Sequence, residues 1–332
     1  MRHASYHEVE ADSPAELGGT LGAMFGGEMR QSVDEARGGR SWNRKVAIAD
    51  RQIAITRRHF PQYIDELEAY ARAAGLPLVH VWVVMCEDEF DDLAAEKCTT
   101  VVTNGGRLVS HNEDWDEDAA DAICVLRKTL AGLTTLELHY TNTPLGGSAL
   151  SINSHGVIQA INSLSHTDGQ VGVPRNVIAR WLSETRDPED DFRRLHEVPR
   201  SAGYNHVLVG ADGSVVDIEC SATRQIMFRP ALPCAHTNHF LSRDLADLEA
   251  AEEDNSTYRR HRSACALLKQ TMTLEEMIAL NSETAHGKQA SIMNRNTIGR
   301  VIVDRDARVA HIWLRREAKL GWVAYPLVFP AP

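Results

Sequence analysis

The sequence predicts an α+β fold, in which a block of helices precedes a series of β-hairpins with further helices between them. Apolar residues recur at helical spacing in the first third of the chain, for example at Ile64, Leu67 and Tyr70. After residue 98 the pattern changes to short β-rich runs separated by turns such as Gly105-Gly106. Consecutive hairpins imply antiparallel pairing rather than the strand–helix alternation of a parallel sheet.

The first helix is expected over 15–38, because Ser13 provides a cap and Pro14 suits the first helical position. Its many glycines indicate either close helix packing or breaks. Three more helices are expected over 43–58, Pro61 to Ala74 and 78–87.

The remaining elements follow from the β-rich runs and the helical segments between them. Strands are expected near 99–103, 107–111, 123–128, 134–140, 147–153, 156–161, 205–210, 214–219, 225–228, 297–304 and 308–314. Helical insertions are expected at about 174–186 and 188–196, with a longer helical region over 242–282.

Composition limits the classes of protein to which the chain can belong. Its 332 residues, with 43% hydrophobic and 24% charged side chains, suit a soluble globular protein of one large or two ordinary domains. A net charge of −11 argues against a nucleic-acid partner, which needs a clustered basic face. The basic run Arg259 to Arg262 is expected to be a solvated helix end.

No apolar stretch is long enough to span a bilayer, and the N-terminal residues lack the apolar segment of a secretory signal. A cytoplasmic protein without a membrane partner is therefore expected. Its six cysteines should be reduced, and none has the spacing of a CxxC pair or a zinc site.

Cys98 is the strongest candidate for a catalytic group, because it opens the first strand of a hairpin. If the bond between Lys97 and Cys98 is cut, the thiol lies beside a free α-amine. An amine with a pKa near ~7.7–8.0 can serve as the base for its own nucleophile. The alternative for Cys98 is a small buried hydrophobe, the interpretation kept for the other cysteines.

Three segments together resemble the acyl-coenzyme A:6-aminopenicillanic acid acyltransferase family. They are Cys98-Thr99-Thr100, Asn112-x-Asp114-Trp115 and His236-Thr237-Asn238-His239. Members are self-processing N-terminal-nucleophile (Ntn) cysteine hydrolases, related to penicillin V acylase and choloylglycine hydrolase.

The resemblance implies an αββα sandwich of two antiparallel sheets with helices on both outer faces. It also implies self-cleavage, with residues 1–97 as a helical N-terminal chain and residues 98–332 as the catalytic chain of one domain. The cleaved N-terminal chain would remain bound as a partner.

The resemblance also assigns roles to individual residues. Asp114 would hold the α-ammonium or the thiol, and Asn238 would donate its side-chain N–H to the oxyanion. Asn162 would contribute to the oxyanion site or bind the substrate amide. Arg295 would lie near the nucleophile, lower the pKa of the Cys98 thiol and pair with Asp114.

A structural alternative stays open for each of these residues. Asp114 fits a solvated acidic loop, Asn238 and Asn162 fit residues that cap turns, and Arg295 fits a surface salt bridge. A metal is not expected, because the acidic run over 113–118 lacks the spacing and glycine of a calcium loop. His236 and His239 have no third ligand in view. No cofactor is expected.

These features favour an amidohydrolase that cleaves a small N-acyl or N-aminoacyl compound through a Cys98 thioester. One alternative is an acyltransferase or amide-forming enzyme of natural-product metabolism, which passes the acyl group to an amine or takes it from acyl-CoA. No phosphate-binding glycine pattern indicates coenzyme A. Another is a non-processing binding protein of the same fold, because Lys97 stands where the family usually has glycine. The sequence leaves the substrate and a homo-oligomer open.

Overall fold

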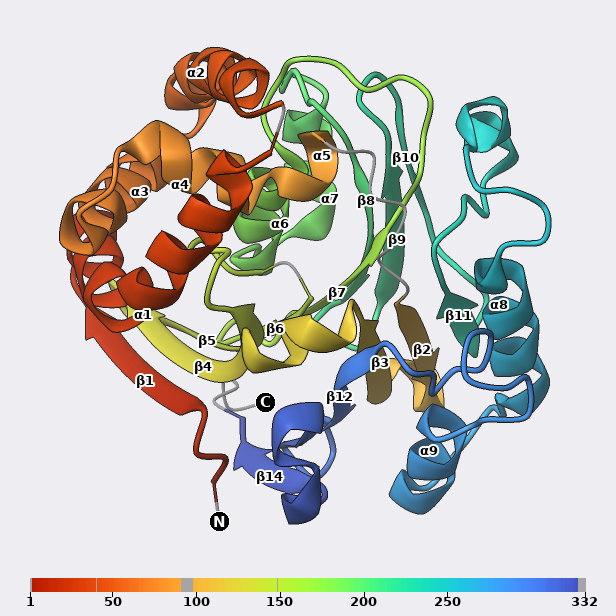
Figure 1. Ribbon diagram of the computed structural model, residues 1–332. Coiled ribbons are helices and arrows are strands. Elements are labelled where there is room, and N and C mark those ends of the chain that lie inside the picture. Colours follow the sequence, from red (N-terminus) through yellow and green to blue (C-terminus); the bar gives the residue numbers. More distant parts are fainter. Residues whose placement is uncertain (1, 40, 91–97, 148, 328–332) are drawn as a thin grey trace.

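The computed structural model describes residues 2–39, 41–90, 98–147 and 149–327. Two β-sheets are stacked face to face, and helices cover both outer faces (Figure 1). This is the αββα order of layers that the resemblance implies. The predicted α+β class is therefore confirmed.

The first sheet has eight strands, in the spatial order β1 (Tyr6–Ala11), β4 (Ile123–Leu130), β5 (Leu133–Tyr140), β6 (Leu150–Asn153), β7 (Ile158–Ser163), β8 (Tyr204–Val209), β9 (Val215–Cys220) and β10 (Gln225–Phe228). The second has six strands, in the order β11 (Cys234–His236), β2 (Thr99–Thr103), β3 (Leu108–Asp114), β12 (Thr297–Asp304), β13 (Val309–Leu314) and β14 (Val323–Pro326).

The sequence analysis did not predict β1, β11 and β14. β1 carries few apolar residues, and only its Val9 and Ala11 are buried. It pairs with β4 in parallel, so the eight-stranded sheet is not wholly antiparallel as predicted. Because β1 comes from the segment before Cys98, residues on both sides of Cys98 contribute strands to this sheet.

The outer layers are helical. The helices beside the eight-stranded sheet are α1 (Pro14–Arg37), α2 (Trp42–His59), α3 (Pro61–Ala74), α4 (Leu78–Met85), α5 (Glu87–Phe90), α6 (Arg175–Ser183) and α7 (Pro188–Leu195). The helices beside the six-stranded sheet are α8 (Ser256–Leu267) and α9 (Leu274–Asn281). Short 3₁₀ helices are η1 (Asn104–Gly106), η2 (Glu117–Asp121), η3 (Arg243–Leu248) and η4 (Arg315–Leu320).

The helical region expected over 242–282 consists of three separate pieces, η3, α8 and α9. Two local caps explain the breaks. The Asn255 side chain accepts from the Thr257 N–H to begin α8, and Thr273 forms a reciprocal capping box with Glu276 to begin α9.

The glycines of the first helix serve close packing, and α1 is unbroken. Gly18, Gly22 and Gly26 recur every fourth residue on the face toward α3. A Cβ atom added at Gly18 would lie 1.9 Å from the Glu66 carbonyl oxygen, and one at Gly22 would lie 2.4 Å from that of Tyr70. Glycine thus lets two backbones approach where any side chain would collide.

The main core lies between the sheets, and alternation along β2 decides which residues enter it. Val102 packs in this core, whereas Val101 packs against the outer helices α8 and α9. By the same alternation Thr100 faces the other sheet and Thr99 faces α8. Among the described residues, no helix is both long and apolar enough to cross a bilayer.

Candidate active site

Cys98 lies just before β2 and is buried. Its Sγ lies 3.5 Å from Glu113 Oε2, its main-chain N–H donates to Asn238 Oδ1 at 2.9 Å, and its carbonyl oxygen accepts from Arg260 Nη1 at 2.5 Å. Three segments far apart in the sequence therefore meet at this residue. Lys97 lies outside the described residues.

Asn238 stands in the loop after β11 and contacts Cys98, as the resemblance implies for its position. Its Oδ1 accepts from Arg260 Nη2 at 2.7 Å as well as from the Cys98 N–H. Because a guanidinium only donates hydrogen bonds, Arg260 fixes which end of the amide faces Cys98. The Nδ2 group donates to the Ser163 carbonyl at 3.1 Å, and an amide nitrogen carries a second N–H that can serve an oxyanion.

The arginine that contacts Cys98 is Arg260 of α8, and not Arg295 as expected. Arg295 is exposed, whereas Arg260 is fully buried and also donates to Thr99 Oγ1 at 3.0 Å. Burial lowers the pKa of Arg260, and the charges of Asp114 and Cys98 partly restore it.

Arg260 was missed because it belongs to the basic run that was expected to be a solvated helix end. A helix of 3.6 residues per turn exposes Arg259 and Arg262 but turns Arg260 toward the core. The signal in the sequence was the apolar periodicity of the segment that follows the basic run.

The carboxylate beside the thiol is Glu113, not Asp114. Successive side chains of β3 point to opposite faces, so Glu113 faces Cys98 between the sheets while Asp114 faces the outer helices. Asp114 Oδ2 accepts from Asn294 Nδ2 at 2.6 Å. Burial raises the pKa of Asp114 to about 6, and the Arg260 charge is the largest opposing effect. Asp114 therefore interacts electrostatically with Arg260.

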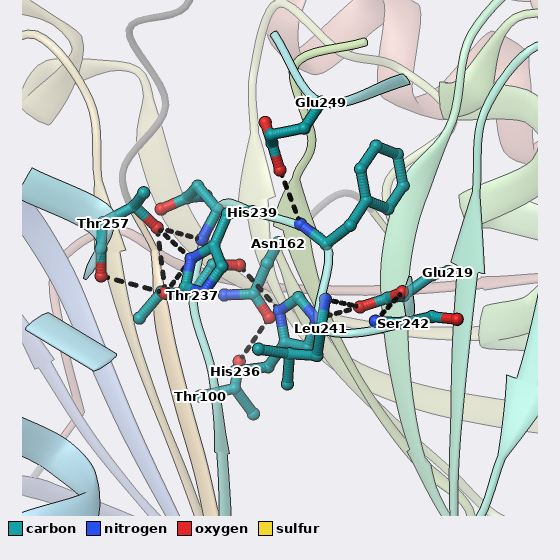
Figure 2. A network of polar contacts seen from close by, with 12 residues as sticks. Thr100, Asn162, Glu219, His236, Thr237, His239, Leu241, Ser242, Glu249 and Thr257 are labelled. Atoms are coloured by element: carbon teal, nitrogen blue, oxygen red, sulfur yellow. Dashed lines mark hydrogen bonds and ion pairs between the residues drawn. The ribbon is translucent and has the colours of Figure 1, made fainter. Parts of the chain in front are cut away.

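Glu113 belongs to a chain of buried hydrogen bonds. The Tyr140 hydroxyl donates to its Oε1 at 2.6 Å, and its Oε2 lies 2.7 Å from His111 Nε2. His111 Nδ1 lies 2.9 Å from Thr100 Oγ1, which donates to Asn162 Oδ1 at 3.0 Å. Asn162 is thus connected to this chain of hydrogen bonds through Thr100 (Figure 2). The Nδ2 atom of Asn162 has no hydrogen-bond partner among the described residues.

Ligand atoms of Cys98, His111 and Glu113 all lie within 4.8 Å of one another, so a metal site must be considered. Two ligands of a tetrahedral zinc ion at ~2.0–2.1 Å are about 3.3 Å apart. The His111–Glu113 distance of 2.7 Å is shorter and is that of a hydrogen bond. The arrangement described here is therefore a hydrogen-bond network.

The histidines on either side of Asn238 anchor its loop (Figure 2). His236 Nε2 lies 2.9 Å from Glu219 Oε1, and the nearby Asp217 and Glu219 raise the pKa of His236 despite its burial. Glu219 also accepts from the main-chain N–H groups of Leu241 and Ser242.

His239 lies on the other side of Asn238. Its Nδ1 lies within hydrogen-bonding distance of the Thr237 and Thr257 hydroxyls, and burial lowers its pKa to about 3. The anchored loop gives Asn238 a fixed position against Cys98.

The sequence profile described as "Acyl-coenzyme A:6-aminopenicillanic acid acyl-transferase" matches residues 101–315, more than half of the chain. The chain belongs to this family. Membership makes it an enzyme of acyl-amide chemistry, an amide hydrolase or an N-acyltransferase. No curated protein sequence matches the chain.

Two solved structures illustrate more distant similarity. Penicillin V acylase from Agrobacterium tumefaciens shares 12% identity with a TM-score of 0.43, over 66% of this chain and 83% of the acylase. A variant of the conjugated bile acid hydrolase from Clostridium perfringens shares 11% identity with a TM-score of 0.45, over 70% of this chain and 92% of the hydrolase.

Proposed function

We propose that this member of the family is a self-processing cysteine amidohydrolase, which cleaves a small N-acyl or N-aminoacyl amide through a Cys98 thioester. The observation that supports this most directly is the double contact of Asn238. The Oδ1 atom of Asn238 accepts from the N–H of Cys98, and its Nδ2 atom keeps a second N–H for an oxyanion. Arg260 fixes the orientation of the Asn238 amide.

The proposed turnover begins with attack of the Cys98 thiolate on the substrate carbonyl carbon. The new S–C bond gives a tetrahedral oxyanion, and the Asn238 Nδ2–H group stabilises it. The C–N bond then breaks, and the α-amine of Cys98 returns the thiol proton to the leaving amine. Water attacks the thioester, which releases the acid and restores the thiol.

Self-cleavage before Cys98 would use the Cys98 thiol and Asn238 on the chain's own amide bond. The sulfur attacks the carbonyl carbon of residue 97, the C–N bond breaks as its nitrogen takes the thiol proton, and water then hydrolyses the thioester. The nitrogen of the cleaved amide bond becomes the α-amine, and it already contacts Asn238 Oδ1. Residues 1–97 would stay bound after cleavage, because β1 is hydrogen-bonded to β4 in the eight-stranded sheet. This leaves one domain made of two chains.

The other predicted residues receive supporting roles. Asp114 lies on the helix side of the sheet, and its negative charge raises the pKa of Arg260. Asn162 offers a buried N–H group for the substrate amide. A cytoplasmic location would keep the Cys98 thiol reduced.

Mass spectrometry of the purified protein tests the proposal. We expect two chains that begin at residues 1 and 98, and an acyl mass on Cys98 after acid quenching with an N-acyl nitroanilide. Cys98→Ala should remain one chain and form no adduct, whereas Cys265→Ala, which changes an exposed cysteine, should behave as wild type. An intact wild-type chain that binds the amide without an acyl adduct would instead identify a non-processing binding protein.

A further inference from the structure

We propose that the substrate amide carries a protonated amine, and that this cation binds in an acidic cavity beside the Cys98 network. The inference rests on the proposed function, since it names the class of substrate for the same nucleophile. It separates this enzyme from one that takes its acyl group from coenzyme A, whose phosphates are anionic.

The cavity has a volume of about 340 Å³ and lies between α1, the α4–α5 region, η2 and the end of β5. Six carboxylates line it: Glu28, Glu35, Glu87, Asp88, Asp118 and Asp121. Among the described residues, no lysine, arginine or histidine contributes to the lining. A wall of one sign raises the local concentration of ligands of the opposite charge.

Two basic side chains close to the cavity already have partners, and one of these partners is a lining carboxylate. Arg175 forms an ion pair with Asp88 and stacks over the Tyr204 ring at 4.2 Å. Arg316 donates to the main-chain oxygen of Asp121 rather than to its carboxylate. The exposed carboxylates at the rim therefore dominate the charge of the entrance.

The lining also contains groups that suit an organic cation rather than a metal ion. Trp115 and Tyr140 contribute aromatic side chains, and aromatic faces attract ammonium groups. Thr141 lines the cavity, is 5% exposed, and has a hydroxyl oxygen without a hydrogen-bond partner among the described residues. A buried hydroxyl of this kind is a ready acceptor for a ligand N–H group.

Tyr140 connects the cavity to the nucleophile. Tyr140 is one of the lining residues, its hydroxyl donates to Glu113 Oε1 at 2.6 Å, and Glu113 Oε2 lies 3.5 Å from Cys98 Sγ. Two successive contacts therefore link the cavity to the thiol, and for this reason we place the ammonium group of the substrate in this cavity.

A first experiment compares three amides of one shape and different charge: the γ-aminobutanoyl, pentanoyl and glutaryl nitroanilides. We expect kcat/KM to be at least about tenfold higher for the cationic amide than for its neutral isostere, and lowest for the anion. The preference should shrink as salt is added, because salt screens exposed charges beyond about 10 Å at 0.1 M. Equal or higher kcat/KM for the glutaryl amide overturns the inference.

A second experiment measures binding without turnover, using Cys98→Ala protein with hexanediamine, hexanediol and adipate in isothermal titration calorimetry. Only the diamine should bind measurably. Asp118→Asn and Asp121→Asn should each weaken it about two- to fivefold, as expected for exposed charges. Asp34→Asn, which removes an exposed α1 carboxylate outside the lining, should leave the affinity unchanged.

The two experiments separate the possible failures. If no nitroanilide is cleaved but the diamine binds and the Asp118 and Asp121 variants weaken it, the amidohydrolase proposal fails and the cation site stands. If amides are cleaved but adipate binds as well as the diamine, or both variants bind like wild type, the cation site is wrong and the amidohydrolase stands.

Discussion

Replacing Arg260 with glutamine should damage both the fold around Cys98 and the reaction. The Arg260 guanidinium is fully buried and donates three hydrogen bonds, to the Cys98 carbonyl, to Thr99 Oγ1 and to Asn238 Oδ1. Glutamine is shorter and uncharged, and its NH₂ group has two N–H donors, so it can keep at most two of these contacts.

The size of the effect follows from the bonds that are lost. A hydrogen bond to a charged group contributes about 1.5–3 kcal/mol, so the loss of at least one bond destabilises the fold by about 1.5–3 kcal/mol or more. Domains are stable by only about 5–15 kcal/mol, so the variant should be folded but strongly weakened. The amide of Asn238 would also lose its fixed orientation, and kcat should fall by about 10²–10³.

Urea denaturation, chain mass and kcat on a nitroanilide substrate measure the three consequences. Arg295→Gln is the matched control, because Arg295 is exposed, and it should lie within about 0.5 kcal/mol of wild type with unchanged kcat. Near-normal stability and turnover in Arg260→Gln, or a larger loss in Arg295→Gln, would refute the assignment of the arginine.

Two other substitutions test the groups around Cys98. Asn238→Ala should lower kcat by about 10²–10³ on preparations matched for processing. A near-normal kcat would mean that Asn238 has only a structural role in its loop. Asp114→Asn should be more stable than wild type above pH 6, because burial raises the folded-state pKa of Asp114 to about 6 and ionisation therefore opposes folding. Because the folded-state pKa lies about two units above the unfolded-state pKa, the gain in the free energy of unfolding should approach about 3 kcal/mol above pH 6. It should vanish below about pH 4. Thermal unfolding from pH 4 to 8 measures it, with exposed Asp116→Asn as a control; an effect independent of pH would contradict the assignment.

Local patterns in the sequence were enough to predict most elements. Capping residues and apolar periodicity predicted helices such as α3, and turn residues predicted hairpins such as β2–β3, because these signals act between near neighbours. β1 escaped prediction because only a neighbouring strand, β4, makes its polar sequence part of a sheet. Strand β11 is too short to carry a pattern of its own.

Cys98 and Asn238 could be proposed from the sequence because their motifs identify them without reference to neighbours, and the structure brings the two residues into contact. The partners of Cys98 could not. Arg260 lies in a basic run whose other two arginines are exposed, and only the packing of α8 against β2 turns it inward.

Glu113 and Asp114 are adjacent carboxylates, and which of them faces the thiol depends on the register of β3 against β2. A shift of one residue would exchange them. The sequence by itself therefore determined the class of fold and the chemistry of the family, and it identified Cys98 as the candidate nucleophile. The tertiary structure decided which charged residues surround Cys98, because burial and strand register belong to the assembled sheets.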